Sequence, residues 1–464
     1  MKIKVVAIAK DEAAYLPEWC FHHLYFGFDA CEVWLNNITD NSHDICKELE
    51  SITHGKFKSI LADDLLEKCL QEGLNFQTEA YNVAFGQARR QGFSHVLFID
   101  LDELWTPQDF MSSVSKYFSD HDMGRAGVVS FNWLIDTPHD LREAFSRPYT
   151  NLMWMHANRH VKSIVNTSAL VDRVNIHTAK LKKNDYYCLE DSSYFDLVDD
   201  DQHARALISK DRFELIRNEV PKAFIYHRIY RSQHEYLSSL DKGRRHASND
   251  RRPFKVNRLG YRPDFKSARA NRYDIDQNKL NDYEWAWCKF RTSNLLEMQF
   301  DARRFITDRY ERVVAKLQSD SFYLFARYQG LFHTVTDKKI QELRKVLNWG
   351  NRPETVNYVI IESAIISEKK LRLTGYGFNL HSRKKILEAK AVSTSGQEYD
   401  LLVTACRPSI SADLFDKLPE NCGFNMESLN EWEGKLMALK VKIGSVEYVV
   451  PNIFYPSSIM LPGA

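Results

Sequence analysis

The sequence lacks several features that would assign the protein to a class at once. Its eight cysteines are scattered without a Cys-Xaa-Xaa-Cys pair, which argues against a structural zinc site and a compact disulfide framework. No segment offers the roughly eighteen uninterrupted apolar residues that a membrane helix requires. The formal net charge is +1, so global charge indicates no particular partner. We therefore expect reduced thiols and at most a peripheral contact with a membrane.

The composition is ordinary for a globular protein. Hydrophobic residues make up 44% of the sequence and charged residues 27%. The 464 residues are enough for two or three domains with ample cores. The first apolar run, residues 5–9, is short and is followed by charge, so we expect a strand rather than a signal peptide. These features predict a cytoplasmic protein.

The most informative stretch runs from Val96 to Glu103, where an apolar run leads into Asp100 and Asp102. Such a run is typical of a strand buried on both faces of a parallel sheet, and ligands of these sheets bind at the carboxyl ends of the strands. Side chains alternate along an extended backbone, so the two acids should share one side and one divalent ion, while Leu101 points into the core. An isolated Asp-Xaa-Asp is also common in solvated turns.

Strands and helices alternate around this stretch. Residues 5–9 and 31–35 predict strands on either side of a helix that Asp11 is expected to cap. Residues 77–90 repeat apolar positions at helical spacing, which predicts a helix just before the acidic motif. This order predicts an α/β fold that opens with a parallel βαβ unit. Further strands are predicted at residues 127–133 and 224–227.

Phe98-Ile99-Asp100-Leu101-Asp102-Glu103 resembles the metal-binding motif of glycosyltransferases with a nucleotide-sugar-binding A-type fold, especially bacterial family 2 members and the related family 92 group. The resemblance implies a Rossmann-like domain with a mixed, mainly parallel sheet. It also implies that Asp100 and Asp102 hold Mn²⁺ or Mg²⁺ against the diphosphate of the donor. Three further segments carry it: Lys10-Asp11-Glu12, Asn36-Asn37-Ile38-Thr39-Asp40 and Gln77-Thr78-Glu79-Ala80-Tyr81-Asn82.

The same resemblance implies which residues contact the nucleotide-sugar donor, for which a UDP-sugar is the first candidate. Lys162, in Lys162-Ser163-Ile164-Val165, would contact phosphate, and His177 would line the site. His227 would be the third metal ligand, since neutral imidazole accepts Mn²⁺ well. Without the resemblance, Asp11 and Asn37 would be interpreted as loop and capping residues. Lys162 would then be an ordinary surface charge, and His177 an ordinary core histidine. The implied donor-binding residues are Lys10, Asp11, Asn37, Gln77, Tyr81, Asp100, Lys162, His177 and Arg231.

An acidic run follows at residues 190–201, with six acids in twelve positions. Such a run is usually a solvated loop. Family 2 transferases, however, often place an Asp of a Glu-Asp pair where it takes the proton of the acceptor hydroxyl. The resemblance therefore implies Glu190 and Asp191 as the catalytic pair, with Asp196 and Asp199 as competing candidates.

A basic run lies between Lys242 and Arg272, with eleven Lys or Arg residues against two acids. Such a run could bind nucleic acid, close over a diphosphate, hold an acidic glycan, dock on anionic lipid or form an exposed loop. No recognisable nucleic-acid-binding motif accompanies it, so we expect no nucleic-acid partner.

Changes in composition and in the spacing of apolar residues divide the chain into three parts. Residues 1–250 form the expected A-type catalytic domain, residues 251–350 a basic loop and helices, and residues 355–464 short strands typical of an accessory β-sandwich. We expect an inverting, metal-dependent glycosyltransferase that transfers a sugar to a glycan or lipid-linked glycan, such as a bacterial surface polysaccharide, in the cytoplasm or at the inner face of the membrane. A nucleotidyltransferase and a non-catalytic glycan-binding protein on a transferase-like fold stay open as alternatives.

Overall fold

The computed structural model divides into two compact units, each described here by itself. Unit 1 comprises Met1–Ser238, Arg244–Arg251 and Lys266–Arg309, and unit 2 comprises Ser239–Gly243, Arg252–Phe265 and Tyr310–Ala464. Most of the basic run and Asp196 lie outside the described residues. The described residues are 1–137, 142–182, 186–194, 198–200, 205–243, 254–255, 260–261, 270–319, 328–346, 357–379, 386–405, 423–433, 436–443 and 446–451.

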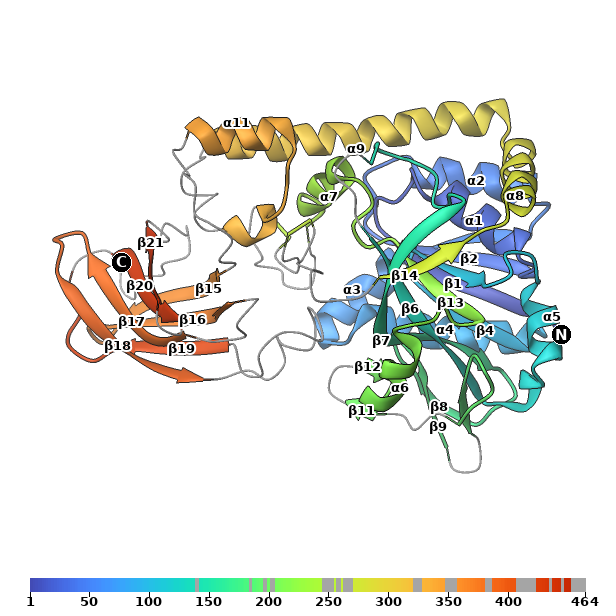
Figure 1. The fold of residues 1–464 in the computed structure, drawn as a ribbon, viewed down its shortest axis with the longest axis horizontal. Coiled ribbons are helices and arrows are strands. Elements are labelled where there is room, and N and C mark those ends of the chain that lie inside the picture. The colour runs from blue at the N-terminus through green and yellow to red at the C-terminus, as the bar shows by residue number, and fades with distance from the viewer. Residues whose placement is uncertain are drawn as a thin grey trace. The chain divides into compact units, whose positions relative to one another are not determined.

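The described strands of unit 1 are β1 (Ile3–Ala9), β2 (Ala30–Leu35), β3 (Phe57–Leu61), β4 (His95–Phe98), β5 (Glu103–Pro107), β6 (Val128–Asp136), β7 (Leu152–Asn166), β8 (Val171–Val174), β9 (Ala179–Leu181), β10 (Tyr187–Leu189), β11 (Val198–Asp200), β12 (Arg205–Leu207), β13 (Ala223–His227) and β14 (Asn271–Asp274). Most of them form one mixed, curled sheet with the path β3-β2-β1-β4-β7-β6-β13-β5 (Figure 1). The first four strands of this path pair in parallel, whereas β7 runs antiparallel to both β4 and β6. The carboxyl ends of β1, β2 and β4 therefore share one edge of the sheet.

Helices cover both faces of this sheet. Those of unit 1 are α1 (Leu16–Tyr25), α2 (Ser42–Ile52), α3 (Asp63–Glu72), α4 (Phe76–Arg90), α5 (Val114–Asp120), α6 (Lys210–Ile216) and α8 (Gln277–Phe290), while α7 (Gln233–Leu240) and α9 (Ser293–Ser319) end in unit 2. In β1, Val5 and Ala7 pack in the cluster that contains α1, α2 and α5, and Val6 packs with α3 and α4. Burial on both faces explains the unbroken apolar run of this strand.

The α/β fold, the strands predicted at the four positions named above and the helix at residues 77–90 are confirmed. The capping role of Asp11 is wrong. Helix α1 begins at Leu16 with Tyr15 as the N-cap, and the Asp11 carboxylate instead accepts a hydrogen bond from Thr39 N at 2.6 Å. The cysteines in the described part of the chain are free thiols. None of the described helices is long and apolar enough to cross a membrane.

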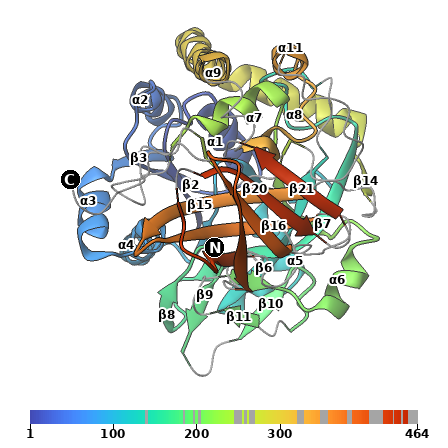
Figure 2. The same ribbon diagram turned by 90° about the vertical axis from the view of Figure 1, so that its left-hand side faces the viewer.

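Unit 2 contains α11 (Lys338–Val346) and an antiparallel sheet, drawn in orange to red in Figure 2. Its described strands hydrogen-bond along one path, β15-β16-β19-β18-β17-β20-β21. The expected antiparallel strands of this part of the chain are therefore present. These strands are β15 (Asn357–Ser367), β16 (Lys370–Asn379), β17 (Ile386–Ser393), β18 (Glu398–Ala405), β19 (Gly423–Ser428), β20 (Leu436–Ile443) and β21 (Val446–Pro451).

Candidate active site at the carboxyl end of β4

The two acids of the Asp-Xaa-Asp motif lie in a turn rather than on an extended strand. Strand β4 ends at Phe98, and the Asp100 carbonyl accepts a hydrogen bond from Glu103 N at 3.1 Å, which closes a turn over Leu101 and Asp102. The alternation that we used to place both acids on one side therefore does not apply. Leu101 is buried in the core as expected. The side chains of Asp100 and Asp102 are 41% and 25% exposed, so both are open to a ligand.

Asp100 is held by side chains from two neighbouring elements. Gln77 of α4 donates through Nε2 to Asp100 Oδ1 at 3.0 Å, and Lys162 Nζ of β7 lies 3.1 Å from Oδ2. Gln77 also donates to the Tyr81 hydroxyl at 3.1 Å. Residues predicted to bind the donor from three separate segments are thus brought together around one carboxylate.

Glu103 is a member of this cluster that the sequence did not predict. It is fully buried, and its Oε2 accepts from Asp100 N at 2.8 Å and lies 3.4 Å from Lys162 Nζ. Its Oε1 has no hydrogen-bond partner among the described residues. Burial raises the pKa of the Glu103 carboxyl to about 7, and the positive charge of Lys162 limits this rise. The only signal in the sequence is the place of Glu103 directly after the motif.

Lys162 supplies a fixed positive charge. Its side chain is fully buried, and Nζ also donates to the Ile176 carbonyl at 3.3 Å. Burial by itself lowers the pKa of a lysine, but Asp100 and Glu103 raise the pKa of Lys162 above its ordinary value. The side chain therefore stays charged at neutral pH.

His227 and a wall of aromatic rings complete the cluster. His227 pairs with Glu103 across β13 and β5, and its Nε2 lies 3.5 Å from Asp102 Oδ2. The Trp133 ring packs against His227 and His177, with centroids 4.4 and 5.3 Å apart. Burial and the nearby charge of Lys162 lower the pKa of His177, so this wall carries no positive charge of its own from His177 at neutral pH.

Arg231 contacts the acidic turn from the segment after β13. Its Nη2 donates to the Leu101 carbonyl at 3.4 Å, and Nη1 lies 3.4 Å from a carboxylate oxygen of Glu12. The guanidinium group also lies 3.4 Å from the ring centroid of Tyr15. Arg231 therefore joins the turn to the segment that follows β1.

The remaining predicted donor residues, Lys10, Asp11 and Asn37, follow β1 and β2. Both Asp11 and Asn37 have positive φ, 49° and 44°. Hydrogen bonds of 2.6 Å from Thr39 N to Asp11 and from Asn37 N to Asp63 fix these loops. Because β1, β2 and β4 are parallel, the loops lie at the same edge of the sheet as Asp100.

Asp191, one of the two predicted catalytic residues, takes part in local contacts. Its Oδ1 accepts from Ser193 N and Oγ at 3.1 and 2.5 Å, and its Oδ2 pairs with Arg212. Although burial raises the pKa of Asp191, these hydrogen bonds hold it below its ordinary value. Asp199, a competing candidate, lies in β11.

Glu190, the second member of the pair, follows β10 and is buried. Burial, together with the charge of Asp191, raises the pKa of Glu190 to about 7. Strands β6 and β7 lie between β10 and β4 in the sheet. The structure therefore does not bring Glu190 and Asp191 to the cluster around Asp100.

Comparison with known proteins adds no assignment, because the chain matches no protein-family model and no curated protein. Within the part of the chain that the structure describes, no three His, Cys, Asp or Glu side chains are grouped as a complete set of metal ligands.

Proposed function

We propose that the protein is a metal-dependent glycosyltransferase that transfers a sugar from a nucleotide-sugar donor, a UDP-sugar in the first place, to a hydroxyl of a glycan or lipid-linked glycan. The observation that carries this proposal is the pair of open carboxylates, Asp100 and Asp102, beside the buried cation of Lys162. Carboxylates bind a divalent cation and a lysine ammonium binds phosphate oxygens, so this arrangement suits a metal-nucleotide complex.

The side chains present fit Mn²⁺ or Mg²⁺. Asp100 and Asp102 offer hard oxygen atoms, and His227 offers a ring nitrogen 3.5 Å from Asp102 Oδ2. A metal that is bound together with a nucleotide needs only one or two carboxylates, because phosphate oxygens and water complete its coordination. The small number of protein ligands therefore agrees with the proposal. When bound, the metal supplies positive charge that offsets the charge of the departing nucleotide.

The other residues of the cluster would position these groups. Glu103 contacts both the backbone of Asp100 and Lys162 Nζ, so it sets the turn and the cation relative to one another. Lys162 Nζ is buried and bonded to Asp100 and to the Ile176 carbonyl, so its fixed positive charge would act on a donor phosphate held beside Asp100, which is how a preorganised charge stabilises a leaving group. Trp133 and His177 would keep water from this side of the donor.

Asp191 stays our proposed base for the acceptor hydroxyl, with Glu190 beside it; this assignment rests on the resemblance, because both residues lie outside the cluster around Asp100. We also propose that unit 1 has the nucleotide-sugar-binding A-type fold, that unit 2 carries the accessory β-sandwich and that the enzyme acts in the cytoplasm or at the inner face of the membrane. The mixed sheet of unit 1, parallel at first and then antiparallel at β7, supports the A-type fold.

Donor turnover by the full chain tests the function. Nucleotide sugars would be incubated with the protein with and without Mn²⁺, and the products would be separated. Release of the free nucleoside diphosphate together with a glycosylated acceptor or free sugar supports glycosyl transfer. Release of pyrophosphate would instead identify a nucleotidyltransferase, and saccharide binding without any donor turnover would identify a non-catalytic glycan-binding protein.

A further inference from the structure

A hollow of unit 1 lies at the ends of β6 and β13, outside the predicted site. It encloses about 410 Å³, which is within the range of about 300–1,000 Å³ usual for small-ligand sites. Its lining includes Asp136 at the end of β6, Tyr226 of β13 and Trp154 at the start of β7. The segment at residues 142–150 provides most of the remaining wall.

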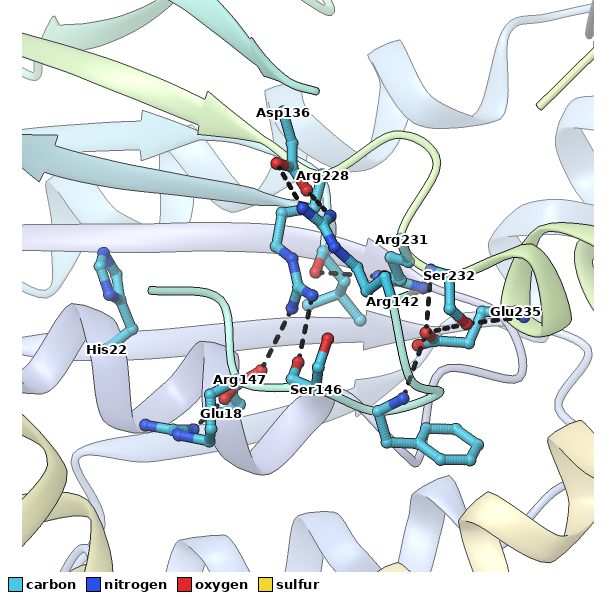
Figure 3. A network of polar contacts seen from close by, with 12 residues as sticks. Glu18, His22, Asp136, Arg142, Ser146, Arg147, Arg228, Arg231, Ser232 and Glu235 are labelled. Carbon is cyan, nitrogen blue, oxygen red and sulfur yellow. Dashed lines mark hydrogen bonds and ion pairs between the residues drawn. The ribbon is translucent and has the colours of Figure 1, made fainter. Parts of the chain in front are cut away.

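This wall segment is fixed to the core (Figure 3). Arg147 pairs with Glu18 of α1, and Arg228 donates through Nη2 to the Ser146 carbonyl at 3.1 Å. Figure 3 shows Arg228 between Glu18 and Ser146, so one guanidinium group connects the wall to α1. Further along the segment, Phe145 N donates to a buried glutamate of α7. The hollow is therefore formed before any ligand arrives, which lowers the entropy cost of binding.

The hollow is also linked to the candidate active site. The backbone N–H of Arg228 donates to the Asp102 carbonyl at 2.8 Å, while its side chain bonds to the wall at Ser146. Tyr226 lines the hollow, and the next residue, His227, lies 3.5 Å from Asp102. Because consecutive side chains of a strand point to opposite faces, Tyr226 and His227 lie on opposite sides of β13, and the hollow is linked to the acidic turn through Arg228.

The charges of the lining balance. Asp136 and Glu143 are acidic, Arg142 and Arg147 are basic, and Arg142 pairs with Asp136 through two of its nitrogens. A phosphate or an anionic head group would gain no net attraction from this set. Asp136 is bonded to Arg142 and Arg147 to Glu18, so the hydroxyl groups of a ligand would bond to the exposed Glu143 carboxylate and to the edges of these ion pairs.

An exposed aromatic residue adds an apolar surface. Trp154 lines the hollow and is 48% exposed, which is unusual for so large a ring. Flat rings of this kind pack against the C–H face of a pyranose while charged groups bond to its hydroxyls. A balanced polar lining beside an open indole is the combination that a neutral sugar requires.

We propose that this hollow binds a neutral saccharide, which is the acceptor glycan of the reaction proposed above. The identification as acceptor rests on that proposed function, whereas the binding of a neutral saccharide does not.

The test is direct binding of the full-length protein to an array of neutral and acidic oligosaccharides, followed by titration calorimetry with the best neutral ligand. We expect neutral oligosaccharides to bind and Trp154→Ala to weaken their affinity about tenfold, as loss of an aromatic contact does. Trp285→Ala is the matched control, because Trp285 of α8 is 62% exposed and does not line the hollow. Glu143→Gln, at an exposed position of the lining, is a second variant if Trp154→Ala fails to fold.

The outcomes separate this inference from the proposed function. Neutral binding that Trp154→Ala or Glu143→Gln weakens and Trp285→Ala does not supports the hollow as a saccharide site, even in a protein without donor turnover. Three results would overturn it: no neutral ligand on the array, stronger binding of acidic ligands, or equal affinity in the lining variants and the control. Each of these can occur in a protein that turns over the donor, so the proposed function would then stand alone.

Discussion

Two buried glutamates of unit 1, Glu103 and Glu190, have the same chemistry in different surroundings. Burial raises the pKa of each carboxyl to about 7, and each stands next to an aspartate in the sequence. Beside Glu103, however, Asp100 and the fixed cation of Lys162 form an open group. Beside Glu190, the Asp191 carboxylate accepts from Ser193 and pairs with Arg212, and both oxygens of Asp100 are likewise engaged, by Gln77 and Lys162. A perturbed pKa therefore does not distinguish the two places, whereas the fully buried cation of Lys162 does, because Arg212 beside Asp191 is 25% exposed.

The largest effect is expected at the open group. Asp102→Ala removes an exposed proposed metal ligand, so Mn²⁺-dependent donor turnover should fall by about 10⁴-fold, the equivalent of several kcal/mol of charge stabilisation. Thermal melting should change little, because Asp102 lies in a turn and is not part of the hydrophobic core. Asp172→Ala, at an exposed position of β8, is the control. Metal-dependent turnover retained by the Asp102 variant would show that the metal does not bind at the group around Asp100.

The second prediction concerns Asp191, the aspartate beside Glu190. If Asp191 accepts the proton of the acceptor hydroxyl, Asp191→Asn should lower kcat by about 10²–10⁴-fold while donor affinity stays near that of the wild type. Transfer kinetics and a separate donor titration measure the two effects. An unaltered kcat would leave Asp191 as the structural partner of Arg212 and would confine the chemistry to the group around Asp100.

Glu103→Gln should have a smaller effect, because Glu103 acts through its neighbours. It holds Asp100 N and Lys162 Nζ, and loss of such a supporting contact lowers metal affinity or activity by about 10–100-fold. The measurement is the Mn²⁺ concentration that gives half-maximal turnover, which should rise. A purely structural role predicts a lower melting temperature with an unchanged Mn²⁺ requirement.

The elements of unit 1 could be predicted because their signals are local. The apolar run of β4 and the helical spacing of α4 are written in adjacent residues. The burial of Glu103 depends on the pairing of β5 with β13, which brings Glu103 opposite His227 from far along the chain. No local pattern contains that pairing, and a third acid beside two others indicates a solvated turn.

The site shows the same division. Gln77, Lys162 and His227 could be selected by their resemblance to family motifs, and the structure places the first two on Asp100 and the third near Asp102. The turn at Asp100 depends on a hydrogen bond from Glu103 N, which an alternation rule for strands cannot anticipate. The hollow near Trp154 is lined by residues of separate strands and of the segment 142–150. No local sequence pattern could predict it, because these residues come together only on folding.

The smallest effect concerns stability and returns to Glu190. Its pKa rises from 4.5 to about 7 on folding, so the folded protein binds this proton more tightly than the unfolded chain. The resulting stabilisation is present below pH 4.5 and is lost as the pH rises through about 7, with an upper limit of about 3 kcal/mol. Glu190→Gln cannot titrate, so its free energy of unfolding should decline less between pH 4.5 and 7 than that of the wild type. Denaturant unfolding at several pH values measures this slope, with Glu67→Gln on the exposed side of α3 as the control. Identical slopes in the wild type and the Glu190 variant would mean that Glu190 ionises in the folded protein much as it does in the unfolded chain, and the likeness of the two glutamates would then be lost.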